Sequence, residues 1–249
     1  MNNDFNIRGK NYEKALQTFP KARRPEENFL LRSIKPKNGQ TILDLACGSG
    51  HFTKIVYNHT NGSTKLIGSD ISNYFIKKLR KEKLKNTNFI LNSETHIPLA
   101  NKSVDTIFSY TGFHHFSNQS AMTKECERIL KRDGKLFVFD IFDCSPNSKY
   151  MDDLLGKYSS TGHEGKYLTK EYTETLAFIA KFSKISFLKE KITRKFKTIN
   201  DLTTFFKELH ALSCSKKVVL KGLKKHLKIK KIKNEWHVSW PIGCVIFQR

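Results

Sequence analysis

The stretch Thr41–Thr53, TILDLACGSGHFT, decides the fold. A short apolar run ends at Asp44, a turn of small residues follows over 46–50, and the chain then continues as the start of a helix. A buried strand that leads into a glycine turn and a helix is how α/β proteins bring backbone amides close to a nucleotide-like ligand. Glycine suits such a turn because a Cβ atom would block both the tight bend and the close approach.

An acidic residue follows this turn at the spacing that nucleoside-binding folds use. Asp70 ends a second apolar run, KLIGSD, about twenty residues after Gly50. A carboxylate at the end of the second strand is placed to bind the two hydroxyl groups of a ribose. The spacing therefore predicts a ribose contact at Asp70.

The same stretch departs from the fingerprint of dinucleotide sites. Thr53 replaces the third glycine of the G-x-G-x-x-G pattern. Asp44 would repel a pyrophosphate, whereas a carboxylate at that position suits a ligand with a positive group. The phosphate-binding loop G-x-x-x-x-G-K-[ST] does not occur in the chain. These departures favour a nucleoside that carries a cationic group.

A run of motifs over Thr41–Asp140 resembles that of the class I S-adenosylmethionine (SAM)-dependent methyltransferases. The first motif of the family, usually D/E-x-G-x-G-x-G, is matched by DLACGSG with an alanine in place of the first glycine, and its acidic second motif by GSDIS. Three further segments follow in the family's order: LNSETHIPLANKSVDTIFS (Leu91–Ser109), TGFHHF (Thr111–Phe116) and ILKRDGKLFVFD (Ile129–Asp140). The resemblance is greatest for the branch that includes quinone-biosynthesis methyltransferases.

This resemblance implies a cofactor and a set of contacts. The cofactor is SAM, and the product is S-adenosylhomocysteine. Ser93 occupies the position where the family often has the aspartate that binds the adenine amino group, so this role passes to Glu94 or to a backbone carbonyl. Tyr110 lines the methyl-donor pocket or else belongs to the core. The implied cofactor-binding residues are Asp44, Ala46, Cys47, Gly48, Gly50, Asp70, Ile71, Ser93, Glu94 and Tyr110.

Helix-like and strand-like segments alternate along the chain, which predicts an α/β fold with a doubly wound, mainly parallel sheet. The resemblance makes this a Rossmann-like sheet of seven strands whose last strand is antiparallel, with a helical cap. The predicted strands are Thr41–Leu45, Lys65–Ser69, Asn88–Leu91, Asp105–Ser109, Lys135–Ile141, Lys184–Ile192 and Gly243–Phe247. The predicted helices start near Pro25 and Gly50 and continue with Tyr74–Leu84, Gln119–Leu130, Lys170–Lys181, Asp201–Leu212 and Ser215–Leu227.

We expect residues 1–249 to form a single methyltransferase domain with a SAM-binding core over 41–145. Residues 1–40 are expected to form an N-terminal arm. Residues 144–167 and 195–241 are expected to form a cap over the ligand cleft, which in open α/β sheets lies outside the carboxyl ends of the strands. In the arm, the adjacent pair Arg23 and Arg24 either meets a carboxylate of SAM or substrate or is solvated.

Three histidines are candidate catalytic residues. An oxygen or activated carbon acceptor needs a base with a pKa near the operating pH, and histidine is the usual choice. His114 and His115 follow the fourth predicted strand at the ligand end of the sheet. The alternative is that one ring packs on SAM or caps the next helix. His163 and Glu164 lie in the glycine-flanked segment SSTGHEGKY, which either closes over a substrate or forms a plain surface turn.

Composition sets further expectations. The N-terminal MNNDFNIRGK lacks the apolar stretch of a signal peptide, and no window has the apolar length of a bilayer span. The five cysteines are scattered and never form C-x-x-C, which favours reduced thiols in a cytoplasmic protein. No His/Cys/Asp cluster has metal-ligand spacing, so we expect no metal.

The net charge of +22 raises the question of a nucleic-acid partner. Only nine of the 45 basic residues are arginine, whereas phosphate and base recognition depends strongly on the planar arginine fork. The basic run Lys216–Lys233 has helical spacing, with apolar residues on one face. The first hypothesis is a methyltransferase for a small apolar or aromatic metabolite, either free or bound to an acidic carrier protein. The alternatives are an RNA or DNA methyltransferase, and a SAM-binding protein without catalysis.

Overall fold

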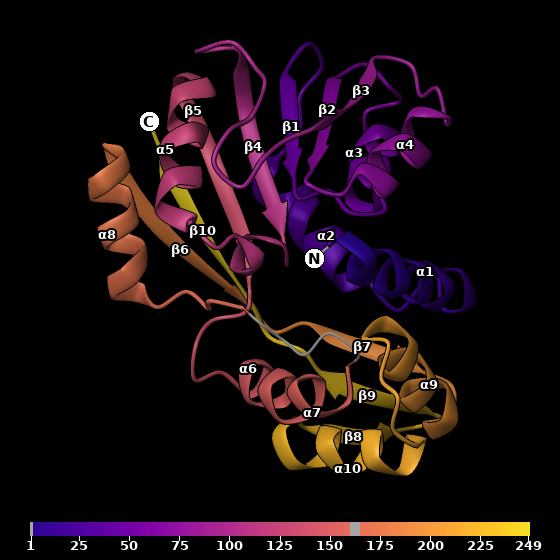
Figure 1. The fold of residues 1–249 in the computed structure, drawn as a ribbon. Helices are drawn as coiled ribbons and strands as arrows, with labels where there is room; N and C mark the ends of the chain where they lie inside the picture. Colours follow the sequence, from indigo (N-terminus) through magenta and orange to yellow (C-terminus); the bar gives the residue numbers. More distant parts are fainter. Residues whose placement is uncertain (1, 160–164) are drawn as a thin grey trace. The chain divides into compact units, whose positions relative to one another are not determined.

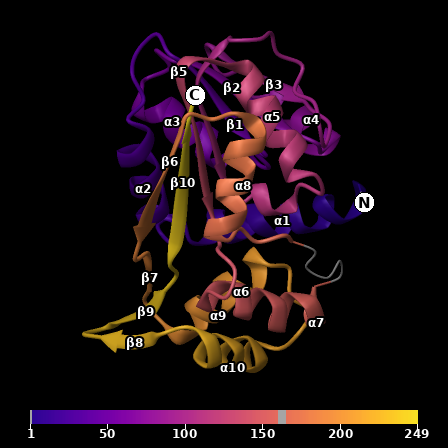
Figure 2. The same cartoon turned by 90° about the vertical axis from the view of Figure 1, so that its left-hand side faces the viewer.

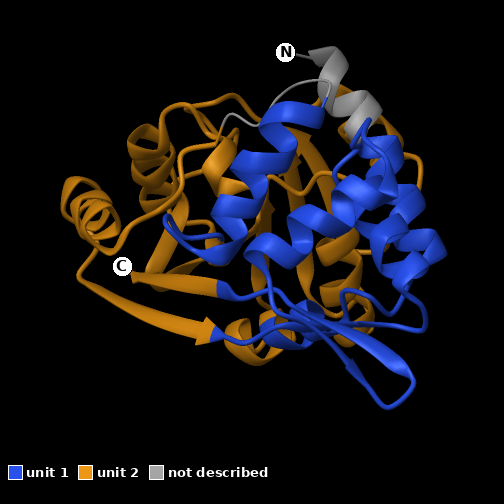
Figure 3. Ribbon diagram, turned by 90° about the horizontal axis from the view of Figure 1, so that it is seen from below, with its two compact units in different colours: residues 1–29, 141–164, 190–242 blue, residues 30–140, 165–189, 243–249 orange. Residues whose placement is uncertain are grey.

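The structure, a computed structural model, describes residues 2–159 and 165–249, with the side chains of 9–159 and 165–249. The chain divides into two compact units (Figure 3). Unit 1 comprises residues 1–29, 141–164 and 190–242, and unit 2 comprises residues 30–140, 165–189 and 243–249. Each unit therefore combines segments that lie far apart in the sequence.

Unit 2 is built on a seven-stranded sheet in the order β3-β2-β1-β4-β5-β10-β6 (Figure 1). Its strands are β1 (Thr41–Leu45), β2 (Lys65–Asp70), β3 (Thr87–Leu91), β4 (Val104–Tyr110), β5 (Leu130–Asp140), β6 (Lys184–Glu190) and β10 (Ile242–Gln248). The neighbours from β3 to β5 are parallel, and β10 is antiparallel to β5. Figure 2 shows β10 and β6 side by side at the end of this sheet. The predicted sheet, with its antiparallel last strand, is confirmed.

The central strands are apolar because both of their faces are covered. Ile42, Leu43 and Leu45 of β1 have no solvent-exposed surface, and Ile42 pairs with Leu66 of β2 on one side and with Thr106 of β4 on the other. Such a strand has no polar face, which is why the sequence shows a continuous apolar run at this position. The polar exception, Asp44, lies near the carboxyl end of the strand.

The helices of unit 2 are short and follow the strands as predicted. They are α3 (His51–His59), α4 (Asn73–Arg80), the 3-10 turn η1 (Phe113–His115), α5 (Gln119–Ile129) and α8 (Lys170–Ala180), and α2 (Arg24–Ile34) contributes to both units. The predicted helix over Tyr74–Leu84 ends earlier, at Arg80. Lys83 has a left-handed backbone with φ 48°, which a helix cannot continue through.

Unit 1 contains helices and a small antiparallel sheet in the order β7-β9-β8. Its helical segments are α1 (Asn2–Thr18), α6 (Pro146–Tyr150), the π turn η2 (Met151–Leu155), α7 (Gly156–Tyr158), α9 (Ile199–Leu209) and α10 (Lys216–His226). Its strands are β7 (Thr193–Phe196), β8 (Ile229–Ile232) and β9 (Glu235–Ser239). The expected cap segment 195–241 therefore contains strands as well as helices.

The predicted helix Ser215–Leu227 is confirmed as α10, but the helical spacing of the basic run does not extend to Lys233. The helix α10 ends at His226, and Leu227 turns to an extended backbone with φ −117° and ψ 151°. The following residues form β8, because the hairpin partner β9 supplies their backbone hydrogen bonds from Ile229 opposite Val238 to Ile232 opposite Glu235. Local spacing could not reveal a partner strand that comes later in the chain.

A buried ion pair organises unit 1. Arg194 donates from Nε and Nη2 to Glu26 Oε1 at 2.9 and 2.6 Å, and Arg23 Nε lies 3.4 Å from the same oxygen. The Arg194 guanidinium also lies 4.5 Å from the ring centre of Trp240. Arg23, expected either to meet a ligand carboxylate or to be solvated, is instead buried beside Glu26, whereas Arg24 is exposed.

Candidate functional site

The candidate cofactor residues gather where the parallel strands of unit 2 end. The arrowheads of β1, β2 and β4 point to one edge of the sheet (Figure 1), and β5 is parallel to β4. At this edge each of these strands is followed by a loop that contains a polar residue or a glycine. Parallel strands bring their carboxyl ends together, so residues from distant parts of the sequence meet there.

The turn after β1 has a backbone that favours glycine. Ala46, Gly48 and Gly50 have φ values of 59°, 51° and 73°, in the left-handed region. At Gly50 a Cβ atom would also lie 2.7 Å from Leu79 Cδ2 of α4. At Gly48 no atom lies within 4 Å of the position of a Cβ atom, so this part of the turn is open. An open peptide face next to a strand end is what a nucleoside requires for close approach.

Asp70 connects the ends of β2 and β1. Its Oδ2 accepts a hydrogen bond of 2.8 Å from the Gly48 amide, and its Oδ1 accepts one of 2.8 Å from the Ser72 amide. Burial raises the pKa of Asp70, although these backbone hydrogen bonds act in the opposite direction. The carboxylate therefore lies beside the open part of the turn, held by two amides. Ile71, the next residue, is half-buried.

Asp44 is a second buried acid near the end of β1. Thr53 Oγ1 of α3 donates to its Oδ2 at 2.6 Å. Burial raises the pKa of Asp44 to about 7; the Thr53 hydrogen bond lowers it, and the nearby Asp70 raises it further. A cationic ligand would reverse this shift, because a positive charge favours the ionised carboxylate. The site thus fits the sulfonium and ammonium groups of SAM. In the sequence Thr53 stands out only as the residue that replaces the third glycine, and its contact with Asp44 was not predicted.

The loop after β3 contains the two candidates for the adenine contact. Ser93 Oγ accepts hydrogen bonds from the amides of Thr95 and His96, at 3.3 and 2.9 Å, and so closes a turn. Glu94 Oε2 accepts one of 3.1 Å from the Ser117 amide. Asn92, which the sequence analysis did not select, is buried, and its Oδ1 has no hydrogen-bond partner among the described residues. The position of Asn92 directly after β3 is the feature of the sequence that could have indicated a role at this site.

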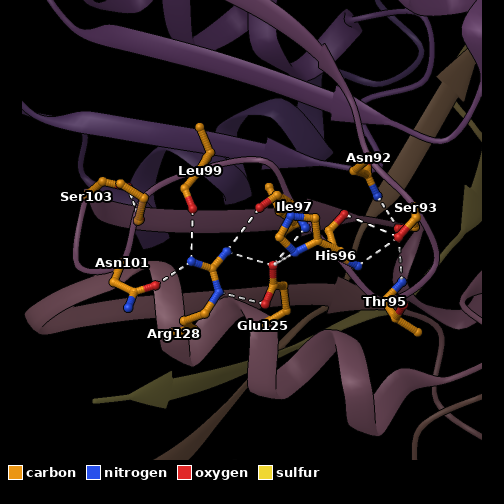
Figure 4. Close-up of polar contacts among 11 residues, drawn as sticks. Asn92, Ser93, Thr95, His96, Ile97, Leu99, Asn101, Ser103, Glu125 and Arg128 are labelled. Carbon is orange, nitrogen blue, oxygen red and sulfur yellow. Dashed lines mark hydrogen bonds and ion pairs between the residues drawn. The ribbon is translucent and has the colours of Figure 1, made fainter.

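Two residues of α5 hold this loop in place (Figure 4). Arg128 donates to the carbonyls of Ile97 and Leu99 at 3.0 and 2.9 Å, and to Glu125 through Nε and Nη2 at 2.8 and 2.7 Å. Glu125 Oε1 also accepts from the Ile97 amide at 2.8 Å and lies 2.8 Å from His96 Nδ1. The loop that contains Ser93 and Glu94 is thus fixed by a charged pair on a helix.

Tyr110, at the end of β4, lies between two aromatic rings. Its ring centre is 4.1 Å from that of Phe52 and 5.0 Å from that of Phe139, and both pairs are stacked. Tyr110 is 6% exposed. Tyr110 is therefore part of the core of unit 2 at the edge where the cofactor candidates meet. Cys47, also buried, packs with Ile76 and Phe89 in a neighbouring apolar cluster.

The histidine candidates differ in their surroundings. His114 is buried, and its Nδ1 lies 2.6 Å from Oδ1 of Asp140 at the end of β5. His115 is half-buried, with its ring centre 4.0 Å from that of His114. His163 lies outside the described residues, as does Glu164. Asp140 was not predicted as a site residue, although it is an acid near the end of the fifth predicted strand.

The described residues contain no group of three or more His, Cys, Asp or Glu side chains that could hold a metal ion. No helix in this part of the chain combines the length and the apolar character needed to cross a bilayer.

Comparison with known proteins matches part of this chain to a family of methyltransferase domains. Residues 43–138 match the family model of a methyltransferase domain. The chain is 26% identical over 167 residues to the demethylmenaquinone methyltransferase of Thermotoga maritima, an alignment that covers 62% of this chain and 70% of that protein. It is 27% identical over 139 residues to the ubiquinone/menaquinone biosynthesis C-methyltransferase of Wigglesworthia glossinidia brevipalpis, covering 53% and 54%.

A solved structure supports the fold. The YcgJ protein of Bacillus subtilis superposes with a TM-score of 0.64, covering 90% of this chain and 97% of that one at 15% identity. The family match falls on the segment that contains β1 to β5, which is the segment with the candidate cofactor residues.

Proposed function

This chain is a class I SAM-dependent methyltransferase, and we propose that it methylates a small apolar or aromatic metabolite. Two relatives support this acceptor class by their names, which refer to menaquinone and ubiquinone biosynthesis. Quinones and their precursors are apolar ring compounds.

We propose that SAM binds at the turn after β1. The observation that carries this proposal is the pair of buried acids, Asp44 and Asp70, beside the open peptide of Gly48. In this proposal Asp70 binds the ribose hydroxyls, Asp44 faces the cationic part of SAM, and the loop of Ser93 and Glu94 meets the adenine. SAM supplies a methyl group on a positively charged sulfur, which leaves the protein to align the acceptor.

A second candidate function is methylation of RNA or DNA, which the net charge of +22 favours. Lysine-rich segments such as Lys216–His226 are consistent with that partner or with an acidic carrier protein that presents the metabolite.

The acceptor atom is oxygen, carbon or nitrogen. The five free thiols support a reducing compartment such as the cytoplasm.

The test is calorimetric binding followed by a transfer assay. S-adenosylhomocysteine should bind in the micromolar range, and NAD and ATP far more weakly; the reverse order would reject the cofactor assignment. Radiolabelled SAM is then offered with quinol compounds and, separately, with RNA over a range of salt concentrations. Methyl transfer into RNA, with binding that persists at moderate salt, would favour the second candidate.

A further inference from the structure

The contact between His114 and Asp140 is the most specific polar arrangement near the proposed site. Asp140 Oδ1 lies 2.6 Å from His114 Nδ1, and Asp140 Oδ2 accepts a hydrogen bond of 3.1 Å from the backbone amide of His114. Asp140 has no exposed surface and His114 is 3% exposed. One carboxylate therefore fixes both the ring and the backbone of the histidine.

This contact determines which ring nitrogen can take a proton. An ionised aspartate only accepts hydrogen bonds, so the hydrogen between the two groups belongs to Nδ1 of His114. In the neutral ring the other nitrogen, Nε2, then has the lone pair. A histidine whose Nδ1–H is held by a carboxylate is the arrangement that lets Nε2 act as a base and stabilises the imidazolium that forms.

The surrounding loop is held close to the proposed SAM turn. A Cβ atom on Gly112 would lie 2.7 Å from Ala46 Cβ, so only glycine allows the loop after β4 to approach the turn after β1 this closely. The His114 carbonyl accepts a hydrogen bond of 2.9 Å from the Lys166 amide. Gln119 Nε2 donates to the carbonyls of Phe113 and Lys166, at 3.2 and 2.7 Å. The histidine is thus positioned from several sides, as a catalytic group requires.

We propose that His114 is the general base of the reaction, that Asp140 is its positioning residue, and that the acceptor is therefore an O–H group or an acidic C–H group. This inference rests on the proposed function. The acceptor's proton moves to Nε2, its electron pair forms the bond to the methyl carbon, and the pair of the broken carbon–sulfur bond stays on sulfur. A neutral amine does not need this base, because its lone pair attacks before its proton leaves.

The first experiment measures the ring itself. In ¹⁵N-histidine-labelled protein saturated with S-adenosylhomocysteine, the imidazole shifts of His114 should show hydrogen on Nδ1. In Asp140→Asn the amide can donate to Nδ1, and the hydrogen should move to Nε2. A matched control is Asp153→Asn in unit 1, because Asp153 binds His226 at 2.9 Å; it should leave the His114 shifts unchanged. Hydrogen on Nε2 of His114 in the unsubstituted protein overturns the proposal.

The second experiment measures transfer with two aromatic probes, 1,4-dihydroxynaphthalene and 1-naphthylamine. The dihydroxynaphthalene should be methylated, and His114→Gln and Asp140→Asn should slow this about 10²–10⁴-fold, the usual contribution of a positioned base. Both variants should bind S-adenosylhomocysteine within about threefold of the unsubstituted protein, on the same order as a surface change. Preference for the amine, methylation of neither probe, or full activity of the variants overturns the proposal.

Folding and cofactor binding are separated from catalysis. If Asp140→Asn does not fold, as judged by its thermal transition, Asp140→Glu keeps the carboxylate and should retain both the Nδ1 hydrogen and part of the activity. If the unsubstituted protein does not bind S-adenosylhomocysteine, it is the proposed function that fails. Normal binding with the wrong histidine tautomer rejects the base alone.

Discussion

The Gly48 amide donates a hydrogen bond of 2.8 Å to Oδ2 of Asp70, which joins the turn after β1 to the end of β2. Glycine at this position leaves the peptide open, and the carboxylate lies at its edge. A nucleoside that approaches this peptide meets the carboxylate at the same time. The hydrogen bond therefore sets the position of the acid relative to the turn.

Replacing Asp70 should weaken cofactor binding. Asp70→Asn is expected to reduce the affinity for S-adenosylhomocysteine by about 1.5–3 kcal/mol, the range for a hydrogen bond to a charged group. The control is Asp105→Asn. Asp105 Oδ2 also accepts a strand amide, that of Thr41 at 2.8 Å, but at the opposite end of β1. Calorimetry should show a loss in the first variant only; equal affinities would exclude Asp70 from the ribose contact.

Asp44 should make the stability of the ligand-free protein depend on pH. Its pKa of about 7 lies above the ordinary value of an aspartate, so the ligand-free folded protein keeps a proton there that the unfolded chain has lost. Stability should therefore fall as the pH rises from about 4 to about 7, by at most about 4 kcal/mol. Chemical denaturation over this range should show a steeper fall of stability in the unsubstituted protein than in Asp44→Asn, in which the raised pKa of Asp70 remains.

The same group should release its proton when a cation binds beside it. Near pH 6.5, SAM binding should liberate a fraction of a proton, which calorimetry detects as a heat that varies with the ionisation enthalpy of the buffer. Asp44→Asn should lose this variation. A heat that is independent of the buffer in the unsubstituted protein would separate Asp44 from the cationic group of the cofactor.

The position of the loop that contains Ser93 and Glu94 should depend on the ionised carboxylate of Glu125. Burial raises the pKa of Glu125, but the hydrogen bonds from Arg128 and Ile97 outweigh it, and the pKa is lowered overall. A lowered pKa means that the stabilisation is present above about pH 4.3, the ordinary value, and is lost as the pH falls through the folded-state value.

Glu125→Gln should consequently weaken S-adenosylhomocysteine binding several-fold at pH 7, because the loop loses its anchor. The matched control is Glu127→Gln on the same helix, since Glu127 binds Arg249 at 2.6 Å and not the loop. The difference in melting temperature between Glu125→Gln and the unsubstituted protein should shrink below about pH 4. An equal effect of the two variants on cofactor affinity would argue against a role of Glu125 in the adenine loop.

Alanine substitutions at the two glycines of the turn should reduce the stability of the protein by different amounts. Gly50→Ala combines a left-handed backbone with a Cβ atom 2.7 Å from Leu79, and should destabilise the protein by more than the roughly 1–2 kcal/mol of left-handed strain alone. Gly48→Ala should cost only the strain. Gly156→Ala is the control, because Gly156 is helical with free space around it, and it should stabilise by about 0.5–1 kcal/mol. Urea denaturation gives the order; a smaller loss for Gly50→Ala than for Gly48→Ala would contradict the close contact.

The central strands of the sheet could be predicted from local sequence because each is a separate apolar run that ends at a turn. The strand over Thr41–Leu45 was predicted with its observed bounds, since the four residues after Thr41 are buried. The antiparallel position of β10 came from family resemblance. The strand β8 was missed because its sequence, Ile-Lys-Lys-Ile, fits a helix equally well until β9 supplies a partner.

The candidate site was predictable in its residues but not in its contacts. Motif spacing pointed to Asp44, Asp70 and His114, each near a strand end. The partner of His114, however, is Asp140, 26 positions later, and that of Arg194 is Glu26, 168 positions earlier. Such pairs arise from the order of strands and the packing of distant segments within each unit, which no local pattern encodes.

The most direct test of the central claim is a crystal structure of the protein with S-adenosylhomocysteine. The account predicts that the ribose hydroxyls lie within hydrogen-bond distance of the Asp70 carboxylate and that the ligand passes over the Gly48 peptide. A ligand bound at another edge of the sheet, or a turn that remains closed by its own side chains, would contradict it.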